Sequence, residues 1–138
     1  MDLSYLVDNL NWVAVLGAWI VSMVWSFTWY SKSLAGKQWM KEVDLKESEI
    51  EKVYAKKVMP IVTTLSLISA FMLGVLLAEV QGWVDGMFDG LVIGSGIAAT
   101  QVTILYAFAL RSRKLMIIDA LWVIVGFALM GLTIGVLA

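Results

Sequence analysis

Four long apolar stretches, which contain only one charged residue between them, restrict this sequence to very few kinds of fold. They span residues 12–30, 59–78, 90–110 and 115–137. Each has close to the length of about 20 residues that a helix needs to cross the hydrocarbon core of a bilayer. A chain in lipid must also pair its own backbone polar groups, which a helix does internally. The sequence therefore predicts an all-α, polytopic membrane protein, a single domain over residues 1–138 whose four transmembrane helices form two αα-hairpins.

The composition narrows the chemistry that is open to such a protein. Of its 138 residues, 61% are hydrophobic and 15% are charged, and the chain has neither Cys nor His. Disulfides, thiolate nucleophiles, histidine bases and the usual zinc and haem ligand sets are therefore excluded. We expect no enzymatic activity, no metal and no cofactor. The net charge of −1 hides a strong local asymmetry and says little about partners. We expect membrane lipid as the surrounding and no nucleic-acid partner.

The positions of the basic residues predict how the chain is oriented. All 10 lie either between the first and second apolar stretches or between the third and fourth. Short loops rich in Lys and Arg stay on the cytoplasmic side of a membrane. We therefore expect a cell (inner) membrane protein with both termini on the non-cytoplasmic side. On that outer side Glu79, Asp85 and Asp89 form an acidic rim, which would attract cations but has no recognised metal-ligand spacing.

Residues 31–58 make the only sizeable polar region of the chain. Asp44 followed by Glu47 resembles a capping box and predicts an amphipathic cytoplasmic helix that leads into the second membrane helix. The expected apolar face of this helix is Ile50, Val53, Tyr54 and Val58, and the expected ion pairs are Glu42–Lys46 and Glu49–Lys52. Pro60 fits either the first turn of the membrane helix or a kink in one continuous helix. The lysines suit either a solvated face or docking to anionic lipid headgroups or a cytoplasmic protein partner.

Small residues recur every four positions in the apolar stretches, and this spacing places them on one helix face. These ridges consist of Ala14, Ala18, Ser22 and Ser26, of Ser66, Ala70, Gly74 and Ala78, of Gly90, Gly94 and Ala98, and of Gly131 and Gly135. Small side chains let helices approach closely in lipid. The ridges predict close helix contact, either within one bundle or between the subunits of a homo-oligomer.

Polar residues inside the apolar stretches are the candidate functional groups. At about 1.5 Å per residue, Asp119 lies roughly 7 Å inside the cytoplasmic boundary, at a depth shared with Ser26, Thr64 and Tyr106. Ser22 lies one turn deeper than Ser26, and Gln101 lies near the midplane.

An unpaired carboxylate at the depth of Asp119 is costly, so we expect it to be paired. The candidate partners are Arg111, Arg113 and Lys32, or a hydrogen bond from Tyr106 or a Trp indole. Asp119 then either ties helix ends together or takes part in a proton or ion route. Gln101 likewise either bonds a neighbouring helix or contacts a solute, because lipid offers its amide no partner.

The segment 11–40 carries most of a resemblance to a known family. Asn11 and Trp12 open the first apolar stretch, Trp29, Tyr30 and Ser31 close it, and Gly36, Lys37, Trp39 and Met40 follow. Together with Arg111, the apolar run 115–118, Asp119, Ala120 and the glycine-rich end of the fourth stretch, these residues make the chain similar to the domain of unknown function 1761 family. The resemblance implies a four-helix membrane protein and supplies no catalytic residue or ligand. Family members often carry proline where Lys32 and Gln38 stand here, which implies a looser turn after Ser31.

Two functions remain open on the sequence. The first is a homo-oligomeric, channel-like or small-solute transport protein whose pathway uses Asp119, Gln101, Tyr106, Ser26, Thr64 and Ser22. Four short helices leave little room for a central pathway in one subunit, so an oligomer is the expected route. The alternative is a non-conducting structural or partner-binding membrane protein that acts through its cytoplasmic helix.

Overall fold

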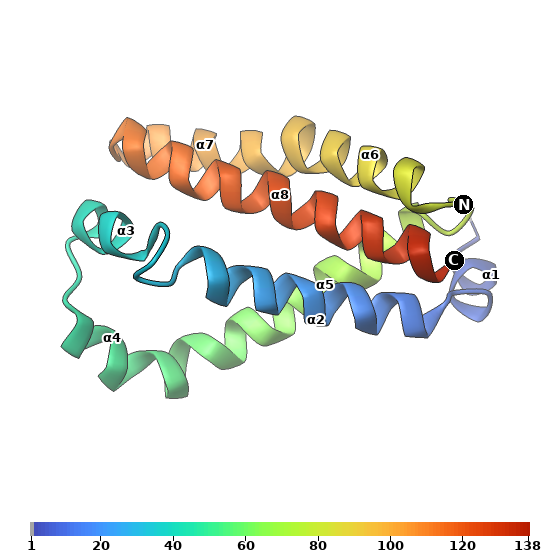
Figure 1. Cartoon of the computed structure of the whole chain (residues 1–138), viewed down its shortest axis with the longest axis horizontal. Helices are drawn as coiled ribbons and strands as arrows, with labels where there is room; N and C mark the ends of the chain where they lie inside the picture. The colour runs from blue at the N-terminus through green and yellow to red at the C-terminus, as the bar shows by residue number, and fades with distance from the viewer. Residues whose placement is uncertain (1) are drawn as a thin grey trace.

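The computed structural model describes residues 2–138, and almost all of them belong to helices (Figure 1). In chain order these are α1 (Leu3–Asp8), α2 (Trp12–Trp29), α3 (Gly36–Val43), α4 (Glu47–Val53), α5 (Met59–Leu76), α6 (Trp83–Ile93), α7 (Ala99–Phe108) and α8 (Arg113–Leu137). A π turn, η1 (Tyr54–Val58), joins α4 to α5, and a second, η2 (Gly94–Ala98), joins α6 to α7. Residues 2–138 contain no strand, so the all-α prediction is confirmed.

Four helical units are long and apolar enough to cross a membrane, as predicted. They run from Trp12 to Trp29, from Glu47 to Leu76, from Trp83 to Phe108 and from Arg113 to Leu137. The third begins seven residues before the predicted start at residue 90. Gly82, with a φ of 100°, separates the turn after α5 from the start of α6. Asp85 suits the first turn of α6 because a carboxylate is favoured at a helix N-terminus.

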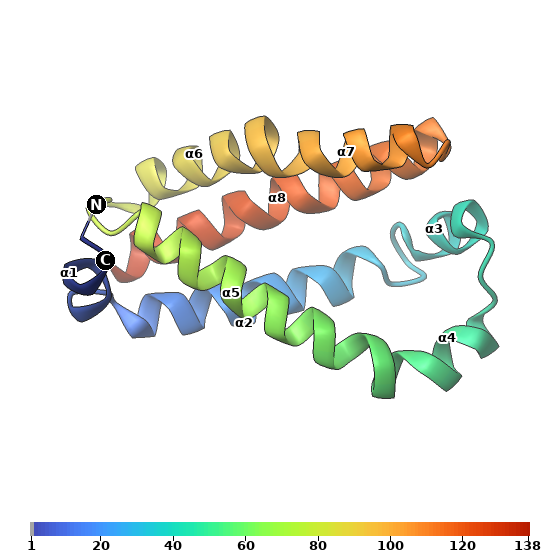
Figure 2. The same cartoon turned by 180° about the vertical axis from the view of Figure 1, so that it is seen from behind.

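The two ends of the bundle differ in charge. One, the acidic end, holds both chain termini, α1 and the turn of residues 77–82, with Glu79 exposed (Figures 1 and 2). The other, the lysine-rich end, holds α3, α4 and the turn of residues 109–112 (Figures 1 and 2). Every long helix runs from one end to the other.

The lysine-rich end contains two short helices where one was predicted. Asp44 does not start a helix, because it ends α3 in the left-handed conformation with a φ of 57°. The next helix begins at Glu47, where the Glu49 carboxylate accepts a hydrogen bond of 2.7 Å from the Lys46 backbone N–H. The predicted capping box is therefore wrong by two residues. Asp tolerates the left-handed region better than most residues, which lets it serve as the helix stop.

Neither predicted ion pair of this region forms. Glu42 instead accepts hydrogen bonds from Ser112 Oγ at 2.5 Å and from Gln38 Nε2 at 2.7 Å, which ties α3 to the start of α8. Glu49 is used as the cap of α4. Within residues 2–138 the only salt bridge joins Lys32 to Glu47, and it links the turn after α2 to the first residue of α4.

Pro60 lies in the first turn of α5, in a helix that continues backward through η1 to Glu47. Proline has no N–H to donate to the preceding turn. The π turn places the Met59 N–H on the Tyr54 carbonyl, five residues back, and so inserts one extra residue just before the proline. Val53, predicted to share a face with Tyr54, is 41% exposed and so lies outside the face of this helix that lines the interior.

Helices α6 and α8 touch backbone to backbone. A Cβ on Gly86 would lie 2.3 Å from the carbonyl oxygen of Gly131, and a Cβ on Gly131 would lie 2.1 Å from that of Gly86. A Cβ on Gly90 would lie 2.3 Å from the Phe127 carbonyl oxygen. No residue larger than glycine fits such a contact without a backbone shift, so these glycines set the distance between the two helices.

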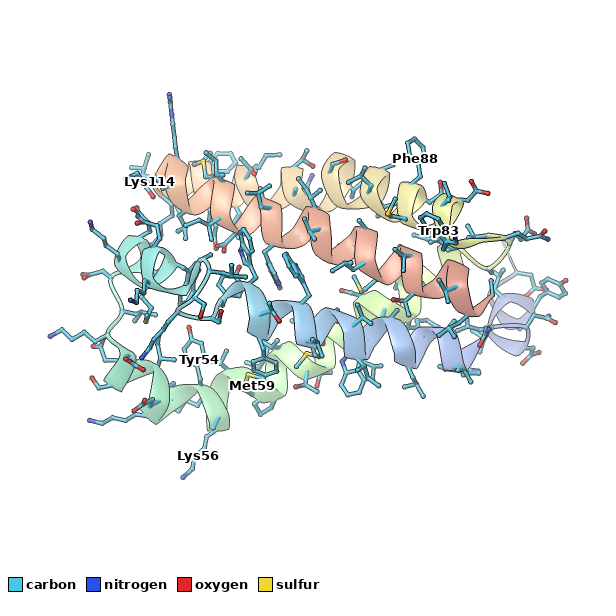
Figure 3. The ribbon with its side chains drawn as sticks, in the orientation of Figure 1. Tyr54, Lys56, Met59, Trp83, Phe88 and Lys114 are labelled. Carbon is cyan, nitrogen blue, oxygen red and sulfur yellow. The ribbon has the colours of Figure 1, made fainter. Side chains whose placement is uncertain are left out.

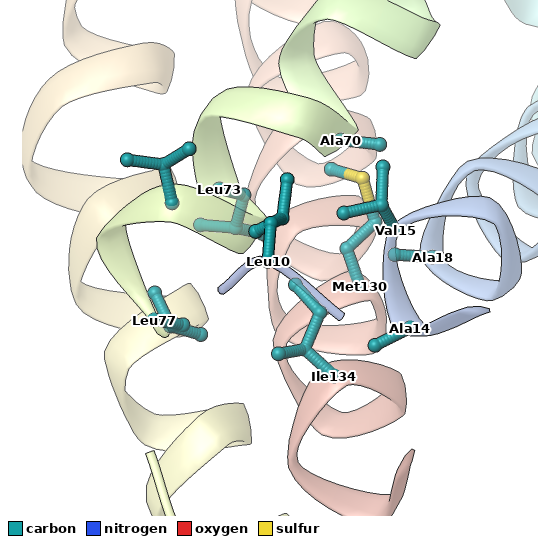
Figure 4. Close-up of a cluster of buried hydrophobic side chains, with 10 residues drawn as sticks. Leu10, Ala14, Val15, Ala18, Ala70, Leu73, Leu77, Met130 and Ile134 are labelled. Atoms are coloured by element: carbon teal, nitrogen blue, oxygen red, sulfur yellow. The ribbon is translucent and has the colours of Figure 1, made fainter. Parts of the chain in front are cut away.

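The hydrophobic core lies between α2, α5 and α8, in the half of the bundle nearer the acidic end (Figure 4). Ala18 and Ala70 are both 0% exposed, and Val15 and Leu73 are 1% exposed. Gly74 faces Val15, whose methyl would lie 2.7 Å from an added Cβ. Members of the small-residue ridges of α2 and α5 are thus buried within one chain, although Ala78, the last member, is exposed.

Candidate binding site around Asp119

Asp119 is the only buried charged residue among residues 2–138, with 3% of its surface exposed. Its Oδ1 accepts a hydrogen bond of 2.5 Å from the Tyr30 hydroxyl, and its Oδ2 accepts one of 2.7 Å from the Tyr106 hydroxyl. Tyr30 follows the last residue of α2, Tyr106 lies on α7 and Asp119 on α8. One carboxylate on α8 is therefore bonded both to α7 and to the residue that follows α2.

The partners of Asp119 differ in part from those expected. Tyr106 donates to it, as predicted. Lys32 pairs with Glu47 instead, and neither Arg111 nor Arg113 forms a salt bridge within residues 2–138. Tyr30 was not identified as a partner from its residue type or depth. The signal that marked it was its place in the Trp-Tyr-Ser segment that carries the family resemblance.

Three indole N–H groups bind α2 to α8 around the carboxylate. Trp25 Nε1 donates to the Trp122 carbonyl at 2.9 Å, and Trp29 Nε1 donates to the Ile118 carbonyl at 3.1 Å. Trp122 Nε1 returns the contact by donating to Ser26 Oγ at 2.9 Å. Buried indoles need such partners, and here they fix the two helices in one register.

A cavity of about 550 Å³ opens beside this cluster. On one side it is bounded by the continuous helix formed by α4, η1 and α5, and the rest of its wall comes from α2, α3, α7 and α8. Aromatic side chains provide much of its wall: Phe27, Tyr30, Trp39, Tyr54, Tyr106 and Trp122. The remaining wall is mainly aliphatic or thioether: Met23, Met40, Ile50, Val58, Met59 and Val62. Asp119 and Ser26 also line this space, which we call the Asp119 pocket. In Figure 3, Tyr54 points into the interior of the molecule and Lys56 points away from it.

A tight turn after α2 places Trp39 on the pocket. The Gly36 N–H donates to the Ser31 carbonyl at 2.9 Å, and a Cβ on Gly36 would lie 2.2 Å from the Tyr30 carbonyl oxygen. Only glycine fits this approach. It brings α3 back so that the Trp39 ring meets the Tyr30 ring edge-on, with centroids 5.5 Å apart. The turn is closed by these contacts, so the looser turn expected from the missing prolines is not observed.

The mouth of the pocket carries two more carboxylates and one ammonium. Lys32 is bound to Glu47, and both side chains remain about half exposed. Glu51, one turn further along α4, is exposed and forms no salt bridge within the described part of the chain. With Asp119 and Glu51 uncompensated, the pocket as a whole is electronegative.

Only half of the predicted pathway residues meet in this pocket. Asp119, Tyr106 and Ser26 line it. Ser22 is half-buried and its hydroxyl donates to the Trp19 carbonyl at 2.7 Å. Thr64 is exposed and donates to the Pro60 carbonyl at 2.8 Å.

Gln101 is also exposed, on the outer surface of α7, and its amide has no hydrogen-bond partner within residues 2–138. Neither of the two contacts predicted for Gln101, with a neighbouring helix or with a solute, is present within the described part of one chain, so this stays a prediction. Depth along a helix fixes the level of a residue in the membrane, whereas the rotation of the helix decides which way the side chain points. The sequence predicted the level of Gln101, Thr64 and Ser22 but not the direction in which their side chains point.

A second cavity, of about 520 Å³, opens at the acidic end between the start of α2, the end of α5 and the end of α8. Asn11 lines it and joins the start of α2 to the end of α8, since its Oδ1 accepts from the Ala14 N–H at 3.1 Å and its Nδ2 donates to the Leu137 carbonyl at 2.7 Å. Of the predicted acidic rim only Glu79 lines this cavity, while Asp85 is exposed and Asp89 half-buried on α6. No group of three or more acidic side chains in residues 2–138 is placed to hold a metal ion.

The two cavities lie at opposite ends of the same three helices, with the hydrophobic core between them. Helix α2 contributes Ala14 to the acidic-end cavity and Ser26 to the Asp119 pocket, and α8 contributes Ile134 and Asp119 in the same way. Val15 and Ala18, which lie between these levels on α2, are at most 1% exposed.

Comparison with known proteins identifies one family. The profile of a family described as "Protein of unknown function (DUF1761)" matches residues 13–135. No curated protein and no solved structure matches the chain. The matched range includes Tyr30, Gly36, Trp39 and Asp119, so the pocket is built from residues inside the family region.

Proposed function

This chain belongs to the DUF1761 family, and we propose that it is a multi-pass membrane protein that binds a small solute beside Asp119 and carries it across the bilayer. The observation that carries the proposal is the buried carboxylate in a cavity of about 550 Å³, a size within the range of small-molecule sites. Charged side chains at membrane depth are expensive and mark solute and ion pathways.

The order of cavity, apolar core and cavity supports transport within one subunit. Core residues such as Ala14 and Ile134 line the acidic-end cavity, and the Asp119 pocket lies on the other side of the core formed by α2, α5 and α8. A carrier of this layout would expose the solute site to one side at a time, as α5 moves against α2 and α8. We propose this route within one subunit in place of the oligomer axis expected from the sequence.

The orientation follows from the basic residues. We propose that the lysine-rich end faces the cytoplasm of a cell whose inner membrane holds the protein, with both termini outside. In this arrangement α2 with α5, and α6 and α7 with α8, form the two hairpins. Helices α3 and α4 then lie at the cytoplasmic surface, and the Asp119 pocket opens toward the cytoplasm.

We propose no enzymatic role for the Asp119 pocket. Both oxygens of its carboxylate are bonded to phenols, and the chain has no Cys or His. A nucleophile held beside a general base, which covalent catalysis requires, is not found among the described residues of the pocket.

We also propose that the protein forms a homo-oligomer through the outer face of α7. The Gln101 amide on that face needs a hydrogen-bond partner that lipid does not supply. A second copy offers one, because two amides can each donate and accept. A Gln101→Leu variant that runs as a smaller species than the wild type in native mass spectrometry would support this contact, and an unchanged subunit number would contradict it.

The absence of Cys makes the transport proposal directly testable. We suggest single-cysteine variants Val62→Cys, in the Asp119 pocket, and Ala70→Cys, in the hydrophobic core, reconstituted in vesicles of defined orientation. Ser33→Cys and Ala138→Cys, which are exposed at opposite ends, serve as orientation controls. Labelling with a membrane-impermeant maleimide is measured from each side.

A carrier predicts that Val62→Cys is labelled from the cytoplasmic side and that Ala70→Cys is labelled, more slowly, from both sides. If Ala70→Cys is never labelled in the folded protein but is labelled fully after denaturation, the core does not open. That result would contradict transport and favour the alternative, a non-conducting protein that acts through α3 and α4 on anionic headgroups or a cytoplasmic partner.

A further inference from the structure

We propose that the Asp119 pocket selects an organic cation with an apolar arm, such as an alkyl- or aryl-substituted ammonium. This inference rests on the proposed function, because it names the class of solute that the pocket takes. Three features of the wall support it: the hydrogen-bond acceptor capacity that the carboxylate keeps, the number of aromatic rings and the distribution of charge.

The carboxylate keeps capacity for a ligand. An ionised Asp can accept about four hydrogen bonds, and the hydroxyls of Tyr30 and Tyr106 use one on each oxygen. Two phenol donors hold the group in place without neutralising its charge. A cation that enters the pocket therefore meets a fixed negative charge whose geometry is already set, which lowers the cost of ordering on binding.

The aromatic wall suits a cation better than a neutral polar solute. Rings attract cations through their negative faces, and a group of them recognises substituted ammonium ions. The Tyr30 ring lies between Trp39 and Trp122, with centroid distances of 5.5 Å and 5.6 Å. These three rings and the carboxylate lie on one side of the pocket. The opposite side, with Ile50, Met59 and other apolar residues of the α4 to α5 helix, provides the surface for an apolar arm.

The charge at the mouth excludes the opposite class of solute. Lys32 is the only cationic side chain in the pocket wall, and Glu47 neutralises it. Glu51 and Asp119 leave the electrostatic balance negative. An anion would meet no free cation on the pocket wall within the described residues, whereas a bound cation would meet the carboxylates of Glu51 and Asp119.

Binding of benzyltrimethylammonium tests this inference without a transport assay. We suggest equilibrium dialysis of the radiolabelled cation against the full-length protein in nanodiscs, with empty nanodiscs as background and with benzyl alcohol and benzenesulfonate as neutral and anionic competitors. The inference predicts saturable binding of the cation that neither competitor displaces. Displacement by benzenesulfonate as effective as by the unlabelled cation, or no saturable binding at all, would overturn it.

Two variants locate the site. Asp119→Asn keeps the shape of the side chain and is expected to weaken cation binding by about tenfold or more, since contacts to a charged group contribute about 1.5–3 kcal/mol. Trp39→Leu removes a ring from α3, outside the packed core, and is expected to weaken binding several-fold. Asp85→Asn, which removes an exposed carboxylate on α6, is the matched control and should bind as the wild type does. Equal affinities for the wild type and both pocket variants would overturn the assignment.

A substituted ammonium can be a free solute or the headgroup of a zwitterionic lipid. Competition by dihexanoyl phosphatidylethanolamine assigns the site to a lipid headgroup, and lack of competition assigns it to a free cation. The labelling and binding experiments together separate this inference from the transport proposal. If Ala70→Cys is labelled from both sides but the cation does not bind, the carrier stands and its solute class is wrong.

Discussion

Helix α8 makes two contacts of opposite character, one with α6 and one with α2. Against α6 it uses glycines, and the two backbones touch through Gly86 and Gly131. Against α2 near the lysine-rich end it uses polar and aromatic groups, with Asp119 held by Tyr30 and the indoles bonded across the helices. The first contact leaves no space and holds the helices together. The second consists of hydrogen bonds around an open cavity, and such bonds hold the side chains of a binding site in a fixed geometry.

The largest effect is expected where the glycine contact is broken. In Gly131→Val the new Cβ would lie 2.1 Å from the Gly86 carbonyl oxygen, so the helices must separate. Overpacking of this kind costs about 1–3 kcal/mol and occasionally more. Thermal unfolding in detergent micelles should show a strongly lowered midpoint. Gly96→Ala, at a glycine with open space around it, is the control and should leave the midpoint nearly unchanged.

A smaller loss is expected when the carboxylate is removed. Asp119→Leu leaves the hydroxyls of Tyr30 and Tyr106 without their acceptor in a buried setting, which costs about 1–3 kcal/mol. The triple variant with Tyr30→Phe and Tyr106→Phe should recover part of this loss, because no unpaired hydroxyl remains. If the single and triple variants unfold at the same midpoint in micelles, the two phenols are not bonded to the carboxylate.

Loss of one indole bond should have a lesser effect. Trp29→Phe removes the N–H that donates to the Ile118 carbonyl, a change of about 1 kcal/mol for a typical hydrogen bond. Trp12→Phe is the control, because that indole lies at the acidic end and is half exposed. Hydrogen exchange of the first two turns of α8 should rise in the first variant only. An equal rise in both would show that the indole bond does not hold α8.

The smallest effect is a change with pH in the docking of α3. The hydrogen bond from Ser112 holds the pKa of Glu42 below its ordinary value of 4.5. A carboxyl group with a lowered pKa stabilises the docked state above its ordinary value, and this contribution is lost as the pH falls through the lowered pKa. Proteolysis within α3 should therefore increase below about pH 4. Glu42→Gln, which keeps an acceptor but does not titrate, should remove this pH dependence.

Much of the architecture was accessible from sequence because it depends on periodicity and length. The four apolar stretches predicted four long helices, and the spacing of Gly90 and Gly94 predicted the face that packs on α8. The depth of Asp119 predicted that it would need a buried partner. These are properties of single helices, and they do not depend on how the neighbouring helices pack.

Other features depended on how helices rotate against each other, which no local pattern records. Val53 faces outward on α4, and Gln101 faces outward on α7. Helix α3 ends at Asp44 because this residue adopts the left-handed conformation, which its residue type alone does not predict. The pocket itself became visible only when α3 folded back over Tyr30, since its wall is drawn from five parts of the chain.

The bond between Asn11 and the Leu137 carbonyl has a consequence for biosynthesis. It joins residues 126 positions apart, so α2 meets this partner only after α8 has been made. Tyr30 likewise meets its acceptor only when Asp119 is present. Until then the indoles of Trp25 and Trp29 lack the carbonyls to which they donate in the finished fold. Synthesis of α8 therefore completes both the contact with α2 and the Asp119 pocket.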